Sequence, residues 1–395
     1  MSTFCNRNEL HFAFSLHTTI KCKACCHTPF REVKNFQDPL DEPWYKQRIH
    51  DHKNNIQNPD CAHCWNLEAN SLFSPRNAES IKDTRHPKLL EIQLNNTCNM
   101  ACLYCFPASS SIWAEKIKDP VYNQSTKRNS KIQETFQQNK TSILNWMSEQ
   151  LAVTGLDTIE NIVLTGGEPT LIDDFYTLVD IILQSGNKIN VHINTNLMTT
   201  ENRLGKFLQA IENLHAQGNS VVLRCSVDGI DSQQEWQRTL SNWKIMQYNL
   251  DKISRTPAQI RIAPTVTPLT LESLLPLFLW IQEYNRTMCT ERLLLEPSPS
   301  LVTSPLALSP EEWFGCFAAE VNECLSMVRS GSIKPVNQEM CISTMENWVK
   351  KQEKPSDTTI RNLVKFLDTN QQLWNLPNWR EIFPKIAKHC EQSSA

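Results

Sequence analysis

The sequence contains no run of 18 apolar residues, and its first thirty residues show no basic segment followed by an apolar one. The first absence argues against a membrane-spanning helix, and the second argues against a secretory signal peptide. Basic residues are not in excess, because the formal net charge is −3, so bulk electrostatics gives no reason to expect nucleic-acid binding. We therefore expect a soluble, cytoplasmic protein with neither membrane nor nucleic acid as a partner.

Glycine is scarce, with only nine residues in 395, so a Gly-Gly pair is expected only about 0.2 times by chance. One pair nevertheless occurs in LTGGEPTL, which follows the apolar run Ile162-Val163-Leu164 and precedes a helical pattern. Glycine at Gly166 and Gly167 suits a strand-to-helix turn at which the backbone approaches a ligand closely. An ordinary tight turn between a strand and a helix is the alternative.

Cysteine, by contrast, is abundant, and 15 cysteines in a cytosolic chain favour metal ligation over disulfides. Three of them, Cys98, Cys102 and Cys105, form a C-x3-C-x2-C triplet that is expected only about 0.02 times by chance. Three thiolates can hold three irons of a [4Fe–4S] cluster and leave the fourth iron open to a substrate or cofactor. A zinc knuckle, the alternative, needs a fourth ligand nearby, and the next hundred residues offer only His192 in a strand-like segment.

The triplet, with Tyr104 before its last cysteine, resembles the radical S-adenosylmethionine (SAM) superfamily. This resemblance implies that SAM binds the open iron and is cleaved to a 5′-deoxyadenosyl radical, which abstracts hydrogen from a substrate. It also implies that the Gly-Gly-Glu turn binds the methionyl ammonium, that the NTN segment meets the ribose, and that Arg238 pairs with the SAM carboxylate. An arginine on a helix that faces solvent is the alternative for Arg238. The residues expected to bind SAM are Tyr104, Gly166, Gly167, Glu168, Asn194, Asn196, Ser226 in the SVDG motif, and Arg238.

Between Lys88 and Glu296 short strand patterns alternate with helical ones, which is typical of βαβ units and a parallel sheet. The resemblance implies an α/β fold, a partial (β/α)6 TIM-like barrel, with the cysteine triplet after strand 1 and the glycine pair after strand 2. Both motifs then lie at carboxyl ends of strands, where parallel sheets bind ligands. The expected strands are Leu89–Asn95, Asn161–Thr165, Lys188–Thr195, Val221–Val227, Gln259–Thr267 and Arg292–Glu296.

Several of these strands alternate polar and apolar residues, although parallel strands buried on both faces normally read as continuous apolar runs. Because side chains alternate with period two, each such strand has one apolar face and one polar face. We expect the apolar faces to pack on helices and the polar faces to line an open, wet lumen. The candidates for holding a substrate there are Glu91, His192, Arg224, Arg261 and Glu296.

The segment 1–86 holds six more cysteines, and two C-x2-C pairs in it could make a closed site for zinc or for an iron–sulfur cluster. Its pattern, followed by Ser74-Pro75-Arg76, resembles the N-terminal segment of twitch-domain radical SAM proteins, which implies an auxiliary [4Fe–4S] cluster. Either Cys5 or Cys22 could be the fourth ligand, and either Cys25 or Cys26 could be spare. The candidate ligands are Cys5, Cys22, Cys25, Cys26, Cys61 and Cys64.

We expect three parts: the cysteine-rich segment 1–86, the barrel 87–296, and a Pro/Ser-rich linker with a helical tail at 297–395. The linker reads EPSPSLVTSPLALSP, and its prolines and serines are expected to break regular structure. The predicted function is a radical SAM enzyme that modifies a peptide or protein side chain and is reduced by a donor such as flavodoxin or ferredoxin. A radical SAM enzyme acting on a small metabolite, and a non-catalytic iron–sulfur or zinc scaffold, are the alternatives.

Overall fold

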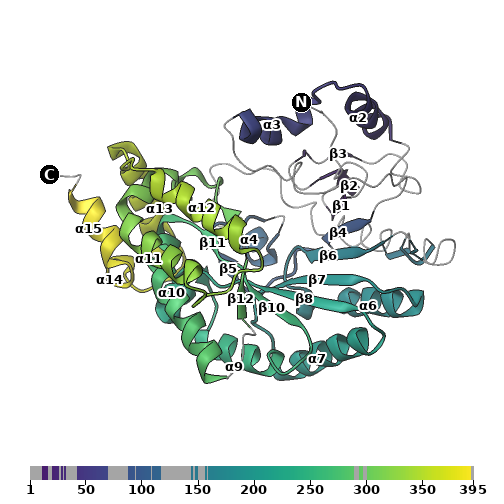
Figure 1. Ribbon diagram of the computed structural model, residues 1–395. Coiled ribbons are helices and arrows are strands. Elements are labelled where there is room, and N and C mark those ends of the chain that lie inside the picture. Colours follow the sequence, from purple (N-terminus) through teal and green to yellow (C-terminus); the bar gives the residue numbers. More distant parts are fainter. Residues whose placement is uncertain are drawn as a thin grey trace. The chain divides into compact units, whose positions relative to one another are not determined.

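The structure is a computed structural model, shown in Figure 1, and it describes most of the chain. The described residues are 11–16, 20–25, 28–29, 31–32, 42–69, 88–93, 95–107, 109–116, 144–145, 147–149, 156–157, 159–288, 293–296 and 300–392. They form two compact units that are interleaved along the sequence. The first comprises Met1–Thr97, Pro107–Ile193 and Gln209–Val221, and the second comprises Cys98–Phe106, Asn194–Leu208 and Val222–Ala395. The division at residues 87 and 297 stays a prediction.

The fold is α/β with a parallel six-strand sheet and helices, as the sequence predicts. The six strands are β4 (Leu89–Gln93), β6 (Asn161–Thr165), β7 (Asn190–Thr195), β8 (Ser220–Cys225), β10 (Gln259–Ile262) and β12 (Leu293–Leu295). In the first unit the strand order is β7-β6-β4, and in the second unit it is β12-β10-β8. Strands β7 and β8 each have residues in both units.

The N-terminal segment adds strands to the first unit, which the cysteine pattern alone does not predict. Strand β1 (His11–Leu16) runs parallel to β4, and β2 (Ile20–Lys23) and β3 (Arg31–Glu32) continue the sheet in antiparallel fashion. The helices among the described residues of this segment are α2 (Pro43–Lys53) and α3 (Ala62–Ala69), joined through the 3-10 turn η2 (Pro59–Cys61).

The predicted alternation of the strands is confirmed within each unit. In the first unit Ile92 on β4 and Ile162 on β6 are fully buried, whereas their neighbours in sequence are partly exposed. In the second unit Leu223 on β8 and Ile260 on β10 are fully buried, while Arg224 and Arg261 beside them are partly exposed. Each unit therefore has an apolar strand face that is buried and a polar strand face that is partly exposed.

Two details of the predicted strands are wrong. The expected strand 259–267 is broken into β10 and β11 (Thr265–Val266) because Pro264, which lies between them, has no N–H to donate to a ladder. The linker after residue 297 does contain regular structure, namely β13 (Ser300–Leu301), which pairs with β11, and a 3-10 turn η5 (Leu306–Leu308). Short elements of this kind tolerate the flanking prolines because few ladder bonds are involved.

In the described part of the chain, helices alternate with these strands along the sequence. They are α4 (Ser111–Lys116), α6 (Asp173–Ser185), α7 (Glu201–Ala216), α8 (Asp231–Gln237), α9 (Trp243–Ile253) and α10 (Pro268–Thr287). Helix α6 is typical, because it buries Phe175, Leu178 and Ile182 along one stripe and ends at Gly186, whose φ of 68° suits a helix terminus.

The tail is helical, as predicted, and belongs to the second unit. It consists of the 3-10 segment η6 (Glu311–Phe317), α11 (Ala318–Arg329), α12 (Gln338–Lys350), α13 (Asp357–Trp374), α14 (Trp379–Ile382) and α15 (Pro384–Gln392). Helix α10 contacts α11 and α15, as Figure 1 shows. Glu272 of α10 accepts hydrogen bonds from the backbone N–H groups of Lys385 and Ile386, which caps the first turn of α15. In the part of the chain that the structure describes, no helix is both long and apolar enough to cross a membrane.

Candidate functional site

The cysteine triplet lies on a short loop of the second unit that is held at its middle by a two-residue ladder. Strand β5 (Ala101–Cys102) pairs antiparallel with β9 (Arg238–Thr239), so that Cys102 faces Arg238 in register. Cys102 is buried, while Cys98 and Cys105 are partly exposed. The backbone N–H of Cys105 donates to the carbonyl of Cys102 at 2.9 Å, which closes the loop around the second and third thiols.

The Cys105 thiol interacts electrostatically with the thiols of Cys102 and Cys98. Burial raises the pKa of the Cys105 thiol, and the neighbouring Cys102 and Cys98 raise it further. Among the residues that the structure describes, no group of three or more His, Cys, Asp or Glu side chains is arranged to hold a metal ion. A [4Fe–4S] cluster makes a different demand, because each thiolate binds a different iron. Three neighbouring thiols on one loop fit that donor set.

Two asparagines of the second unit lie at the end of β7, and one of them contacts this loop. The side-chain amide of Asn196 donates to the Sγ of Cys98 at 3.7 Å and to Oδ1 of Asn99 at 3.0 Å. The Oδ1 of Asn194 is buried and has no hydrogen-bond partner among the described residues. A buried acceptor without a partner is costly, so a bound molecule with a hydroxyl or N–H donor would satisfy it. Asn194 therefore fits the predicted contact with a cofactor.

Asp228 and Arg238 form a buried ion pair beside the triplet. Asp228 is fully buried, and Arg238 is 5% exposed. Nη2 of Arg238 donates to Oδ1 of Asp228 at 3.0 Å, and its Nε lies 2.8 Å from Oδ2. Asp228 also accepts from the hydroxyl of Tyr104 at 2.6 Å and from the backbone N–H of Thr265 at 2.8 Å. The carboxylate thus joins the cysteine loop, β9 and β11.

The free edge of the Arg238 guanidinium points at sulfur. Its Nη1 donates to the Sγ of Cys102 at 3.6 Å, and its carbon lies 5.4 Å from the centre of the Tyr104 ring. Burial lowers the pKa of Arg238, but Asp228, Tyr104 and Cys102 outweigh burial and hold it well above its usual value. Burial raises the pKa of Cys102 and Asp228 raises it further, although Arg238 opposes both. The alternative of a solvent-facing Arg238 is therefore wrong, and its role toward SAM stays a prediction.

Helix α8 stabilises the SVDG turn through hydrogen bonds of one side chain. Oε1 of the fully buried Gln234 accepts from the backbone N–H groups of Asp228 and Gly229, and its Nε2 donates to the carbonyl of Ser226. Ser226 is partly exposed and follows β8 directly. The side-chain alternation of β8 places Asp228 after Arg224 and Ser226 on the polar face. Asp228 is not among the residues expected to bind SAM. The alternation with period two, which puts it on the same face as Arg224 and Ser226, is the sequence signal that could have identified it.

The glycine pair lies in the first unit, and its neighbour is the chain itself. A Cβ on Gly166, whose φ is +114°, would lie 2.6 Å from the carbonyl oxygen of Asn95, and one on Gly167 would lie 2.0 Å from that of Thr97. The N–H of Gly167 donates to Asn95, and that of Glu168 donates to Thr97. The segment that leads into the cysteine triplet therefore requires these glycines, whether or not a ligand also does.

Glu168 is buried and uses one carboxylate oxygen locally. Its Oε1 accepts from the N–H and the hydroxyl of Thr170, which caps the 3-10 turn η4 (Pro169–Leu171). The contact between the Gly-Gly-Glu turn and the SAM ammonium stays a prediction.

The predicted substrate residues fall into two sets. Glu91 and His192 are partly exposed on β4 and β7 of the first unit. Arg224, Arg261 and Glu296 come together in the second unit, where Nη2 of Arg224 lies 3.0 Å from Oε1 of Glu296, and Nη1 of Arg261 lies 3.9 Å from Oε2. Their role toward a substrate stays a prediction.

Part of the predicted N-terminal metal site lies outside the described residues, namely Cys5 and Cys26, and for Cys22 the structure describes only its place in β2. Cys25, Cys61 and Cys64 are buried. The Sγ of Cys61 accepts from Nη2 of the buried Arg48 at 3.2 Å and lies 3.5 Å from Nε2 of His52. The choice of metal and of ligands stays open.

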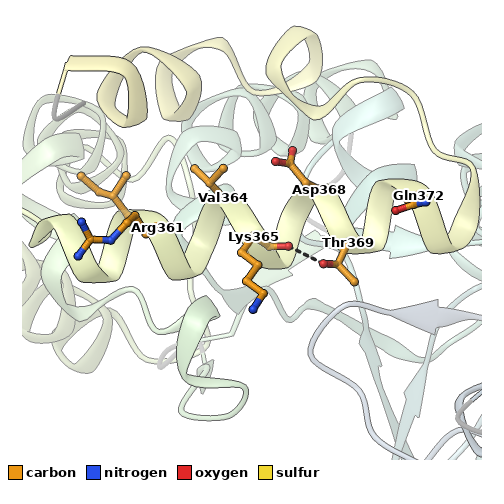
Figure 2. Close-up of a pocket in the computed structure, with 7 residues that line it drawn as sticks. Arg361, Val364, Lys365, Asp368, Thr369 and Gln372 are labelled. Carbon is orange, nitrogen blue, oxygen red and sulfur yellow. Dashed lines mark hydrogen bonds between the residues drawn. The ribbon is translucent and has the colours of Figure 1, made fainter. Parts of the chain in front are cut away.

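A shallow cavity of about 450 Å³ lies along the exposed side of α13 (Figure 2). All of its lining residues that the structure describes come from this single helix, and its floor carries no cysteine, histidine or glutamate. Asp368 there is engaged by Arg380 and Trp379 of α14. The cavity therefore contributes no chemistry to the candidate site.

Comparison with known proteins gives one family match. The model of the radical SAM superfamily matches residues 92–251. The sporulation killing factor maturation protein SkfB of Bacillus subtilis (strain 168) is 24% identical over 196 residues, which is 49% of this chain and 40% of SkfB. The matched segment thus spans less than half of that relative.

Two solved structures are also similar to the chain. One is anSMEcpe with bound AdoMet, with a TM-score of 0.41 and 16% identity over 62% of each chain. The other is Streptococcus suis SuiB bound to S-adenosylmethionine, with a TM-score of 0.40 and 12% identity over 81% of this chain and 69% of that one. At TM-scores below 0.5 these likenesses carry no argument about function.

Proposed function

Residues 92–251 form a radical SAM superfamily domain, and from this premise we propose that the chain is an enzyme that cleaves SAM reductively and abstracts a hydrogen atom from a peptide. The observation that carries the proposal is that Cys98, Cys102 and Cys105 lie on one loop with Tyr104, where the Cys105 thiol interacts electrostatically with the other two thiols. The family implies a [4Fe–4S] cluster and SAM as cofactors.

In this proposal Cys98, Cys102 and Cys105 would hold the cluster, and its fourth iron would be open to SAM. When bound, the cluster supplies the electron that cleaves SAM to methionine and a 5′-deoxyadenosyl radical. A donor such as flavodoxin or ferredoxin provides that electron. The chain's own part is to orient the reacting carbon and to exclude water and stray hydrogen donors.

The buried pair of Asp228 and Arg238 positions the loop. Arg238 donates to the sulfur of Cys102, and Asp228 accepts from Tyr104, two residues further along the same loop. A cation beside a thiolate stabilises the anionic sulfur, and hydrogen bonds to cluster sulfurs raise the reduction potential. Arg238 therefore favours both retention of the cluster and its reduction.

Support for a peptide substrate is the description of SkfB as a maturation protein for a sporulation killing factor. Arg224 and Ser226, on the same strand face, are both partly exposed, so a substrate could contact them.

The test is 5′-deoxyadenosine formation. The full chain is reconstituted anaerobically with iron and sulfide, mixed with SAM and dithionite, and the product is quantified by liquid chromatography. Cys102→Ala should abolish product, because the loop then supplies only two thiolates. Cys341→Ala is the matched control, because Cys341 is also a buried thiol of the second unit but lies on α12. No product from the wild type, or equal product from Cys102→Ala, contradicts the proposal and leaves a non-catalytic scaffold.

A further inference from the structure

We propose that Arg224 and Arg261 bind a carboxylate of the substrate. This carboxylate binds in addition to that of Glu296, which already lies near both arginines. The inference deepens the proposed function and rests on it for the reaction that the bound substrate undergoes. It adds the chemical class of the substrate, an acidic one. All three residues belong to the second unit.

The three residues lie at the carboxyl ends of three neighbouring parallel strands. Arg224 is the penultimate residue of β8, Arg261 is the penultimate residue of β10, and Glu296 directly follows β12. Arg261 and Arg224 are paired in register, and the N–H of Glu296 donates to the carbonyl of Ile262 at 2.9 Å. Open α/β sheets bind their ligands at this edge.

The charges of the group do not balance. Two arginines stand abreast on adjacent strands, where like charges repel each other, and one glutamate faces them both. Arginine does not deprotonate in proteins, so the group keeps one excess positive charge. Burial lowers the pKa of Arg261, and Arg224 lowers it further against the effect of Glu296. One carboxylate would neutralise the group, whereas a phosphate dianion would overcharge it.

Glu296 leaves part of the arginines' hydrogen-bonding capacity unused. Only Arg224 reaches it at hydrogen-bond distance, 3.0 Å, while Arg261 stands 3.9 Å away. Nε of Arg224 and Oε2 of Glu296 are buried and have no hydrogen-bond partner among the residues that the structure describes. In a purely structural ion pair we would expect an arginine to form two parallel hydrogen bonds to the Glu296 carboxylate, because this bidentate geometry is frequent for arginine and carboxylate.

The group also lies along the path to the cysteine loop. Arg224, Ser226 and Asp228 follow one another on the polar side of the same segment, and Asp228 contacts Arg238, which donates to Cys102. In extended backbone two residues span about 6.6 Å, so Arg224 and Asp228 are at most about 13 Å apart. A carboxylate held at Arg224 would anchor a substrate within the length of a few residues of the proposed reaction site.

The test measures binding of defined carboxylates to the full chain by isothermal titration calorimetry at low salt. The probes are N-acetyl-L-glutamate α-methylamide for an acidic side chain, N-acetylglycine for a chain terminus, and N-acetyl-L-glutamine methylamide as the neutral counterpart. Wild type should bind at least one carboxylate probe and not the neutral one. Whichever carboxylate binds more tightly identifies the source.

Variants should shift this binding in opposite directions. Glu296→Gln removes the competing carboxylate and should tighten it about tenfold, while Arg261→Gln should weaken it about tenfold, the size expected for one charged hydrogen bond. Glu283→Gln and Arg286→Gln are the matched controls, because these residues form an exposed Arg–Glu pair on α10. They should change nothing, and thermal melts show whether each variant is folded.

Two results overturn the inference. One is equal binding of the neutral and carboxylate probes, and the other is a Glu296→Gln variant that is folded but does not bind carboxylates more tightly. The assay needs neither SAM nor a reduced cluster. Failure here with 5′-deoxyadenosine still formed refutes the carboxylate site alone, and absence of 5′-deoxyadenosine with binding intact refutes the proposed function alone.

Discussion

Two regions of the chain place a buried arginine against a cysteine sulfur, and the acidic residue described near each arginine makes different contacts. In the second unit Arg238 donates to Cys102 and is neutralised by the fully buried Asp228. In the first unit Arg48 donates to Cys61, with His52 also near the sulfur. The nearby Asp51 is instead held by the amides of Gln47 and Asn58. A donor to sulfur is therefore common to both regions, and in the second unit Asp228 also joins that cation to Tyr104 of the cysteine loop.

The largest expected effect is on iron content and separates the two regions directly. Replacing Cys98, Cys102 and Cys105 by alanine should remove all iron held by the loop, because no thiolate remains there. The same protein is then assayed for iron and zinc by mass spectrometry after anaerobic reconstitution. Iron near four per chain would indicate an N-terminal cluster, and zinc alone would contradict one. Cys61→Ser in the wild-type background should leave the loop iron in place, and loss of all iron there would break the distinction between the regions.

Asp228→Asn should have the next largest effect, because it leaves Arg238 buried without a counter-charge. Breaking a buried pair in this way costs about 3–5 kcal/mol of the free energy of unfolding. Urea denaturation of the metal-free chain measures it. Glu283→Gln removes the carboxylate of an exposed pair and should cost less than about 0.5 kcal/mol. A loss below 1 kcal/mol for Asp228→Asn would show that the pair is not the support that its burial indicates.

The smallest expected effect concerns Asp51 and pH. Hydrogen bonds from Asn58 and Gln47 lower its pKa. A lowered pKa gives stability that is present above the unfolded value and is lost as pH falls through the folded value. Gln47→Ala should therefore reduce stability at pH 7 and make its decline between about pH 5 and 3 shallower. Urea midpoints at these pH values test this, with Gln209→Ala, which breaks a neutral amide pair, as the control. An unchanged pH dependence would contradict it.

Much of the fold could be predicted because the strands carry their own period. The strand 161–165 was predicted to the residue, since its apolar run ends at the glycine pair. The strand 259–267 was predicted too long, because period two alone does not register the missing N–H of Pro264. Strand β1 was not predicted, although its sequence HFAFSL alternates larger apolar residues with smaller or polar ones.

The site was less predictable, because its contacts are distant in sequence. The thiol triplet follows from spacing, but the partner of Arg238 is fixed by the turn of α8, which returns the chain to Asp228. The scarcity of glycine in the sequence singles out the glycine pair. Its contact, however, is with the backbone at Asn95 and Thr97, which lies some seventy residues earlier in the chain. Pairings of this kind require the tertiary structure.

The ladder between β5 and β9 is only two residues long, yet its register decides which side chains face each other. Ala101 stands opposite Thr239 and Cys102 opposite Arg238. Displacement of either strand by one position would turn the guanidinium to the reverse side of the ribbon. Helix α8 therefore fixes the number of residues between Asp228 and Arg238. A single insertion or deletion between residues 229 and 237 should remove the contact between Arg238 and the sulfur of Cys102, even though all three cysteines of the loop are unchanged.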